Sequence, residues 1–375
     1  MKPWQLSPLL IVSSFSYLAH AETTQSGWVD QLLEKLGASE TIDTSEGIDW
    51  GVLPGPFANP EQGIGFGMAA VGLYSPADWT PKTPYSTLAI KSYISSTGSY
   101  GLGVENRSYL NEDKLRLIGD AWISHSPQHY WGIGKKAAQN DDNKREYNGQ
   151  IIKLTPKVSY EFLPDRYISL GWDYQHYSQQ TLASTNSVSE YKLSNQQSSG
   201  ISVALEYDSR DFEPNPYSGQ LWFAEWIDYK TALGSDQNYT RLTLNYRQYV
   251  QLNSDNILAW DVYGQRVDGD IPWYGYAEMG NDERMRGYYT GQYRDRYLLS
   301  GQIEWRHRFN QRHGMVTWFG GGNIANKSEQ LLSSKFLPTF GVGYRFAFKP
   351  RINVRIDYAL GKDSSGFYFH INEAF

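Results

Sequence analysis

The stretch Arg351-Ile352-Asn353-Val354-Arg355-Ile356-Asp357-Tyr358 alternates strictly between polar and apolar side chains. Successive side chains of a β-strand point in opposite directions, so the polar members share one face and the apolar members share the other. A soluble sheet can also alternate in this way. Charges at alternate positions of a long strand are costly in a dry core, but they cost little on the wall of a water-filled barrel. The stretch therefore favours a membrane-spanning β-barrel.

The same alternation recurs earlier and divides the chain into strands. Residues 241–247 alternate between polar and apolar side chains, and residues 299–309 do so around Glu304. From Gly63 onward we predict about sixteen strands, an even number as in bacterial single-chain barrels. The predicted strands are 63–74, 84–96, 98–110, 114–125, 129–137, 149–162, 166–179, 199–208, 218–231, 237–251, 254–268, 296–310, 314–324, 336–348, 351–361 and 366–375. The strand 129–137 is predicted mainly because the number of strands should be even, since its own alternation is weak.

The predicted connections differ in length between the two ends of the barrel. With both termini in the periplasm, the outer connections are 111–113, 140–148, 181–198 and 269–295, and the inner joints include 163–165 and 349–350. Short inner turns and long outer loops are typical of outer-membrane barrels. We therefore predict an all-β chain in which residues 63–375 form one closed antiparallel transmembrane β-barrel.

The composition fits this fold and excludes other classes of protein. The net charge of −6, from 34 basic and 40 acidic residues, disfavours a nucleic-acid partner. The chain has no cysteine, which excludes disulfides and thiolate chemistry. Its 29 tyrosines and 13 tryptophans suit the aromatic girdles of an outer-membrane barrel. A mean hydropathy of −0.56 excludes a bundle of membrane helices.

The N-terminus is typical of an exported protein. A positively charged start, an apolar stretch over 6–18 and the small residues of Ala19-His20-Ala21 predict a signal peptide that covers residues 1–21. After this cut, no segment approaches the about 18 apolar residues that a membrane helix needs. We expect export and residence in the cell outer membrane.

Residues 22–62 form a predicted periplasmic lead-in. Its segment 28–36 has the apolar spacing of a short amphipathic helix, and Gly37 is a suitable C-cap. The segment 52–56 contains two prolines and a glycine, which break regular structure. The helix could plug the barrel, lie on the inner leaflet, dock a periplasmic partner or a second copy through residues 22–50, or be a loosely held lead-in.

The last ten residues favour a strand that closes the barrel. Phe367, Phe369, Ile371 and Phe375 lie on one face of the predicted strand 366–375. A final strand that ends on an aromatic residue is associated with recognition by the barrel-insertion machinery of the outer membrane. We therefore interpret Phe375 as an assembly signal.

Three stretches resemble the barrel of the bacterial surface-antigen superfamily, to which BamA and TamA belong. The stretch 207–219 looks like the periplasmic turn of that family, with matching residues Asp208, Arg210, Asp211 and Gly219. Met285-Arg286-Gly287-Tyr288 is similar to the signature of the family's sixth external loop. The block 354–368 resembles the family's terminal strands. The resemblance covers residues 200–375 well and residues 63–200 loosely.

The loop signature implies a lock between a loop and the lumen wall. A long loop in a wide barrel tends to fold inward, where an arginine needs a carboxylate partner. In the family this arginine pairs with a glutamate on the following strand, which here implies that Arg286, beside Gly287 and Tyr288, pairs with Glu304. Gly320 stands where the family has a second carboxylate, so the lock is either weaker or rebuilt from other lumen residues. The alternative is that Arg286 is a solvated loop residue.

The resemblance departs from the family at the N-terminus. Members that insert barrels or move polypeptides carry periplasmic polypeptide-transport-associated domains, and too few residues for such a domain lie between Ala21 and Gly63. We expect a stand-alone barrel that serves outer-membrane assembly or the transport of lipid or polypeptide. It would work at the seam between strands 63–74 and 366–375, where Gly63, Gly65 and Gly67 soften the pairing. The alternative is a passive channel.

The sequence contains no clear catalytic pattern. Hydrolase, metalloprotease and phosphate-loop motifs are missing. His125 and His129 lie at a strand end, and Asp141-Asp142-Asn143 is a charged loop, so neither predicts a metal site. We predict no catalytic residues, cofactor or metal, although a hydrolase site on the lumen face stays an alternative. The expected partners are outer-membrane lipid and, during biogenesis, the insertion machinery.

Overall fold

The computed structural model describes residues 34–39, 41–59, 63–81, 83–182 and 195–375. The predicted signal peptide lies outside these residues. Most of the predicted helix 28–36 also lies outside them, and Glu34 and Lys35 at its end are helical. Within the described residues, no helix is long and apolar enough to cross a membrane.

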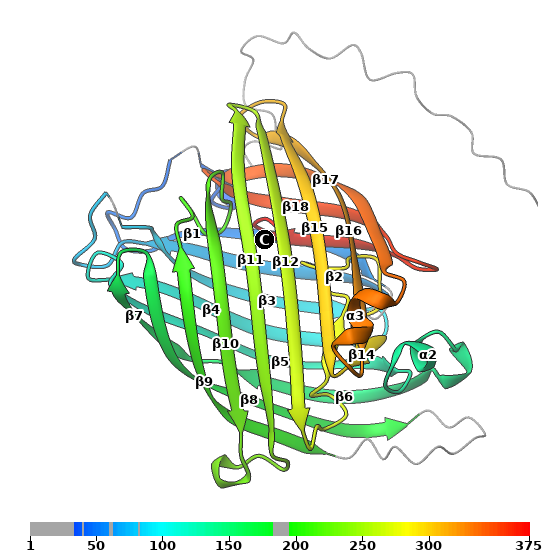
Figure 1. Cartoon of the computed structure of the whole chain (residues 1–375). Coiled ribbons are helices and arrows are strands. Elements are labelled where there is room, and N and C mark those ends of the chain that lie inside the picture. Colours follow the sequence, from blue (N-terminus) through cyan, green and yellow to red (C-terminus); the bar gives the residue numbers. More distant parts are fainter. Residues whose placement is uncertain (1–33, 40, 60–62, 82, 183–194) are drawn as a thin grey trace, which may run out of the picture.

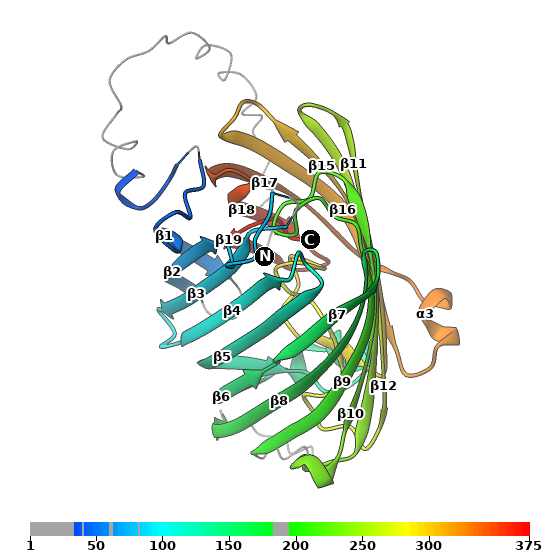
Figure 2. The same cartoon turned by 90° about the vertical axis from the view of Figure 1, so that its left-hand side faces the viewer.

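The described chain is one large antiparallel sheet that curves around a lumen (Figures 1 and 2). The strands of this sheet are β1 (Asp49–Asn59), β2 (Gly63–Tyr74), β3 (Ser86–Ser95), β4 (Tyr100–Leu110), β5 (Leu115–Tyr130), β6 (Arg145–Leu154), β7 (Lys157–Leu163), β8 (Arg166–Leu182), β9 (Gln196–Asp208), β10 (Gly219–Tyr229), β11 (Tyr239–Asn253), β12 (Asn256–Gly269), β15 (Tyr297–Arg308), β16 (His313–Ala325), β17 (Leu337–Lys349), β18 (Ile352–Leu360) and β19 (Ser365–Ile371). The short elements in the connections are α2 (Lys135–Ala138), η1 (Asp141–Asn143), η2 (Thr231–Leu233), β13 (Ala277–Met279), β14 (Tyr293–Asp295) and α3 (Glu329–Ser333).

The described sheet provides sixteen wall strands. The sheet has 17 hydrogen-bonded strands. The short strands β6 and β7 both lie between β5 and β8, so they are two halves of one wall strand. Counted in this way, the described wall has sixteen strands. Each wall strand pairs with the next along the chain, and β1 also pairs with β19 through Ala58 and Phe367, which closes the ring. The all-β barrel predicted from the sequence is confirmed.

Two errors in the predicted strands cancel in this count. The segment 129–137 is not a strand: β5 continues to Tyr130, and Lys135–Ala138 is helical. The first wall strand, β1, was missed because Pro54 and Pro56 suggested a break. Proline is tolerated on an edge strand, because on the unpaired side no neighbouring carbonyl would accept a hydrogen bond from the N–H that proline lacks. The wall therefore begins at Asp49, inside the predicted lead-in, and not at Gly63.

The missed strand also inverts the predicted side of an early turn. We call the end of the barrel that carries the joints 164–165 and 350–351 the turn end, and the opposite end the loop end. The segment 111–113 was predicted at the loop end but lies at the turn end. There the Tyr167 hydroxyl donates to Asp113 over 2.9 Å, and the Glu161 N–H donates to the carbonyl of Lys114 over 2.8 Å.

The two faces of the wall follow the predicted alternation over most of its area. On β18, Asp357 is fully buried on the lumen side, while Tyr358 on the outer face is 48% exposed. Ile352 and Val354 depart from the pattern, because these outer-face residues are also buried. They belong to an apolar cluster with Leu53 and Val71 of the first two strands. Part of the outer face near the end of the chain is therefore covered by the start of the wall.

Candidate functional site

The seam between β1 and β19 is built differently from every other joint of the described wall. Ala58 opposite Phe367 is the one residue pair in register. Nearer the turn end, the outward-facing Phe369 lies against Gly55, which faces inward on β1 and where a β-carbon would overlap the phenylalanine ring. Here β19 passes inside β1, and the two strands overlap through side chains instead of pairing edge to edge.

The lead-in holds this overlap at the turn end. The Val52 N–H donates to the carbonyl of Leu36 over 2.7 Å, and the Ser39 N–H donates to the carbonyl of Phe348 on β17 over 3.2 Å. Lys349 forms an ion pair with Asp49 in the same region. Residues 36–39 therefore bridge the first strand and the last strands, where direct backbone pairing between them is missing.

The connection 270–296 folds into the lumen and presents Arg286. Its strands β13 and β14 and the segment that joins them contribute Met279, Met285, Tyr288 and Tyr293 to an apolar cluster with wall residues of β10, β11, β12, β15, β16 and β17. Met285 has a φ of 52° and Gly287 a φ of 98°, so the chain is left-handed on both sides of the arginine. A β-carbon at Gly287 would also overlap the backbone at Leu360 and Gly361, and only glycine satisfies both demands.

The structure brings Arg286 and Glu304 together, with both side chains fully buried. A second carboxylate, Asp357 of β18, accepts from Nη1 of Arg286 over 2.6 Å. The guanidinium also lies 3.6 Å from the centre of the Trp318 ring, a cation–π distance. Arg286 is therefore paired on two sides and stacked on a third.

Asp357 supplies the second carboxylate that the family resemblance expects at the position of Gly320. Asp357 is surrounded by Arg286, Arg345 and Arg355, whose nearest nitrogens lie 2.6, 2.6 and 3.4 Å from its oxygens. The lock is thus rebuilt from the last strands of the wall, one of the two outcomes expected from the sequence. The alternation already placed Asp357 inward, but its pairing with the loop could not be inferred because two strands, β16 and β17, lie between it and Glu304.

The loop also contacts β17 and β19 through hydrogen bonds beside Arg286. The Thr339 hydroxyl donates to the carbonyl of Arg286 over 2.6 Å, and the Gly287 N–H donates to the hydroxyl of Tyr368 over 2.9 Å. The Tyr288 hydroxyl donates to the carbonyl of Pro338 over 2.6 Å. The loop therefore holds β19, the strand that borders the seam, and its second neighbour β17 from within the lumen.

The turn motif 208–219 closes the turn end beneath the lock. Asp208 binds Arg210 through two bonds of 2.8 and 3.1 Å, and Gly219 has a φ of 97° with no room for a β-carbon beside Ser209. Asp211 accepts from the Tyr217 N–H over 3.0 Å. All four residues singled out in the sequence thus shape this turn.

Glu213 connects the turn motif to lumen-facing residues of the wall strand β4. It contacts the hydroxyl of Tyr109 and lies 3.7 Å from Arg107. Burial alone would raise the pKa of Glu213, but the charges of Arg210 and Arg107 outweigh it and hold the pKa below its usual value. This half-buried carboxylate therefore stays charged and ties the turn to the wall.

Phe375 does not lie on the outer face as expected. The strand β19 ends at Ile371, and the chain turns inward at Asn372, which has a φ of 69°. Phe375 is buried against Tyr249 of β11, and its carbonyl oxygen accepts from Arg306 of β15 over 2.7 Å. The alternation predicted the wrong face for Phe375 because the left-handed Asn372 reverses the direction of the side chains that follow it. The tail Asn372–Phe375 therefore crosses the lumen.

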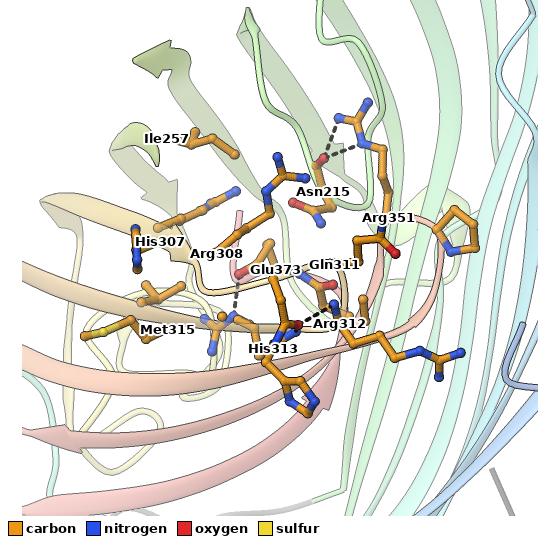
Figure 3. A pocket seen from close by; sticks show the side chains of 18 of the residues that line it. Asn215, Ile257, His307, Arg308, Gln311, Arg312, His313, Met315, Arg351 and Glu373 are labelled. Atoms are coloured by element: carbon orange, nitrogen blue, oxygen red, sulfur yellow. Dashed lines mark hydrogen bonds and ion pairs between the residues drawn. The ribbon is translucent and has the colours of Figure 1, made fainter. Parts of the chain in front are cut away.

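A cavity of about 480 Å³ lies beside this tail at the turn end (Figure 3). Glu373 projects among its lining side chains, bound to Arg345 and Asn353 over 2.7 Å each. Arg351 reaches the carbonyl of Asn215 in the turn motif and forms an ion pair with Asp211. The lining cations are Arg306, Arg308, Arg312, Arg345, Lys349 and Arg351. Most of these cations already contact a carboxylate, so the side chains around the cavity form an internal network of ion pairs that closes this end of the barrel.

The comparisons with known proteins decide the family. The sequence model of the Omp85 superfamily domain matches residues 89–375. The chain belongs to the Omp85 superfamily. The resemblance to the surface-antigen barrels of BamA and TamA is thereby confirmed, and the chain is an outer-membrane β-barrel of that superfamily. The comparison with curated proteins finds no match.

Solved structures agree with the Omp85 fold at low sequence identity. BamA from Haemophilus ducreyi lacking POTRA domains 1–3 is 13% identical, with a TM-score of 0.54, over 91% of this chain and 76% of that chain. CdiB from Acinetobacter baumannii and CdiB from Escherichia coli are 12% and 10% identical, each with a TM-score of 0.54 over 86% of this chain. This chain spans 59% and 61% of those two structures. These likenesses show the fold alone.

The described part of this Omp85 barrel offers little for metal chemistry. No group of three or more potential ligands among its His, Asp and Glu residues is placed to hold an ion. His129 lies 3.7 Å from Glu146 and beside the rings of Trp131 and Tyr289. Asp141–Asn143 forms a single 3₁₀ turn.

Proposed function

We propose that this Omp85 barrel acts at its β1–β19 seam, in outer-membrane assembly or in the transport of lipid or polypeptide. The observation that carries the proposal is that, within the described residues, one backbone pair joins the two strands. An unpaired strand edge can accept another strand. At 7 residues, β19 is also shorter than the about 9–11 residues that a strand needs to cross a bilayer, which favours local thinning beside it.

The loop lock supports this reading over a passive channel. The hairpin β13–β14 and the buried Arg286 occupy the lumen, and the tail Asn372–Phe375 crosses it near the turn end. A steady open pore would require both to leave. We propose that Arg286, Gly287 and Tyr288 keep the lumen shut to free diffusion while the seam does the work.

A disulfide across the seam tests the proposal. Ala58→Cys with Phe367→Cys joins the one pair in register, and the absence of native cysteine gives a clean background. In cells that need the protein, we expect oxidation to stop growth or change the lipid and protein content of the outer membrane. A thiol reductant should restore both.

The matched control is Leu205→Cys with Ala224→Cys across β9 and β10, which pair along their length. This disulfide should have no effect, because that joint never opens. Unchanged growth and membrane composition with a fully oxidised seam would end the proposal.

The remaining parts of the proposal concern export and partners. We propose that residues 1–21 direct export, that the turn motif and Phe375 serve recognition during barrel insertion, and that residues 22–50 recruit a periplasmic partner or a second copy. No catalytic step is proposed. Co-purification in mild detergent, with and without residues 22–50, would identify the partner, and identical partner sets would refute the recruitment.

A further inference from the structure

The inner face of the wall beside the seam carries a row of aromatic rings. Phe57 of β1, Tyr93 of β3 and Trp122 of β5 all face the lumen. The ring centres of Phe57 and Tyr93 lie 5.8 Å apart in an edge-on contact, and those of Tyr93 and Trp122 lie 6.0 Å apart and nearly parallel. All three side chains are half-buried. Barrel lumens are ordinarily polar, so an apolar strip there needs an explanation.

Glycines on the intervening strands turn this row into a flat floor. Each ring covers a position where a β-carbon would overlap it: Phe57 covers Gly65, Tyr93 covers Gly101, and Trp122 covers Gly103. The opposite wall is different, since its inward positions on β11 and β12 include Thr243, Asn245 and Gln265. The floor is therefore a local feature of the wall next to the seam.

A cavity of about 450 Å³ stands on this floor, within the usual range of about 300–1,000 Å³ for small-molecule sites. Its other side is the last strand, residues 367–371, so it lies directly behind the part of the seam without backbone pairing. Membrane-facing Met68 and Phe367 line one side, and Lys91, Asp282 and His370 form a polar end in the lumen.

We propose that this cavity holds an acyl chain of a membrane phospholipid that has entered through the seam. The inference rests on the proposed function and names its substrate class. The floor matches an acyl chain. The polar end carries the ion pairs Lys91–Glu105 and Asp282–Arg355, and neighbouring charges of both signs match a zwitterionic headgroup. A polypeptide strand fits the floor less well, because β2 to β5 are paired on both edges and the free backbone edge lies across the cavity on β19, away from the aromatic rings.

Photo-crosslinking tests the site directly. The full chain, with Tyr93 replaced by benzoylphenylalanine, is placed in vesicles of phosphatidylethanolamine and phosphatidylglycerol and irradiated. We expect a phospholipid adduct there and at the same replacement of Ile94, which is 66% exposed on the membrane face. The same replacement of Thr243 on the far lumen wall should give no adduct. A missing adduct at Tyr93, or equal adducts at Tyr93 and Thr243, would overturn the proposal.

A cavity-filling variant provides the second arm. A β-carbon at Gly67, which lines the cavity, would meet nothing nearer than 3.6 Å, so Gly67→Leu fits the fold and fills the space. It should abolish the Tyr93 adduct and leave the Ile94 adduct unchanged. The matched control is Gly264→Leu on β12, where the nearest atom is 3.8 Å away. A Tyr93 adduct that survives Gly67→Leu would contradict the site.

The two arms separate this inference from the proposed function. A lipid adduct together with a harmless seam disulfide would leave the lipid site standing and reject the seam mechanism. An essential seam with no lipid adduct at Tyr93 would reject the site and leave the mechanism.

Discussion

The seam and the wall opposite it close the same barrel by different means. The strands β11 and β12 pair residue by residue from Tyr239 opposite Gly269 to Gln251 opposite Ile257. The strands β1 and β19 share one pair and otherwise overlap, with Phe369 set into the space left by Gly55. Backbone hydrogen bonds hold β11 to β12 along their length, whereas the described part of the seam relies on side-chain packing beyond its one pair. We therefore propose that the seam is the joint that opens at the lowest cost.

Two internal devices connect these regions. The Arg286 lock bonds to β15, β17 and β18 and, through Gly287, to β19, so it supports the seam from within. The tail Asn372–Phe375 links the end of β19 to Tyr249 and Arg306 on the far wall. If the comparison is correct, removing either device should loosen the seam while the far wall stays intact.

The largest effect is expected from Arg286→Ala. Glu304 keeps Arg306 as a partner, and Asp357 keeps Arg345 and Arg355, so we expect the lower end of the about 3–5 kcal/mol that breaking a buried charge pair costs. We expect a lower thermal unfolding temperature in detergent and frequent channel openings in planar bilayers. Arg286→Lys should not restore the wild type, because a lysine cannot bond both carboxylates in the same way. Wild-type stability and conductance in Arg286→Ala would contradict the lock.

Phe375→Ala should have the next largest effect, limited to the tail. Burial of a phenylalanine side chain contributes about 1.5–3 kcal/mol, which tail docking loses in the variant. Carboxypeptidase should then trim the folded variant while sparing the folded wild type. Heat-unfolded samples of both proteins serve as the control and should be trimmed at similar rates. Equal resistance of the two folded proteins would show that the tail does not depend on its ring.

Gly55→Leu should act on the seam alone. The new side chain occupies the place of the Phe369 ring, and overpacking of this kind costs about 1–3 kcal/mol. We expect slower formation of the Ala58→Cys and Phe367→Cys disulfide. Gly301→Leu, where the nearest atom to a β-carbon is 3.7 Å away, should leave the disulfide rate unchanged. The same rate in both variants would argue against the overlap.

The smallest effect is a pH dependence of tail docking. Burial raises the pKa of Glu373, but Arg345 and Arg306 and the bonds from Arg345 and Asn353 outweigh it and lower the pKa. Docking is therefore supported above the usual value near 4.5 and weakens as the pH falls through the lowered pKa. Carboxypeptidase trimming should rise in acid for the wild type but not for Glu373→Gln. A wild type without this rise would exclude the carboxylate as a docking contact.

Much of the fold could be predicted from the sequence, because alternation reports which face of a strand meets water or lipid. It placed Glu304 and Asp357 in the lumen and located every wall strand except β1, whose place in the count was taken by the wrongly predicted segment 129–137. The alternation does not show which other segment of the chain packs against a given face of a strand. Pro54 and Pro56 looked like a break because the pattern does not show that β1 has an edge with little pairing to lose.

The site was predictable in part for the same reason. Arg286 and Glu304 could be linked through the family resemblance, and the structure places them in contact. Asp357 is distant from both in sequence, and its role depends on how the last strands curve around the loop. Phe375 was misplaced because one left-handed residue, Asn372, redirects the chain into the lumen.

Amide hydrogen exchange in lipid nanodiscs tests the central claim most directly. The amides on the edge of β19 that faces β1, between Phe369 and Ile371, should exchange rapidly, because they have no partner strand there. Amides of both strands at the β11–β12 joint should stay protected. Slow exchange at both joints would mean that the seam is held by its backbone, and the account of it as the weak joint would be wrong.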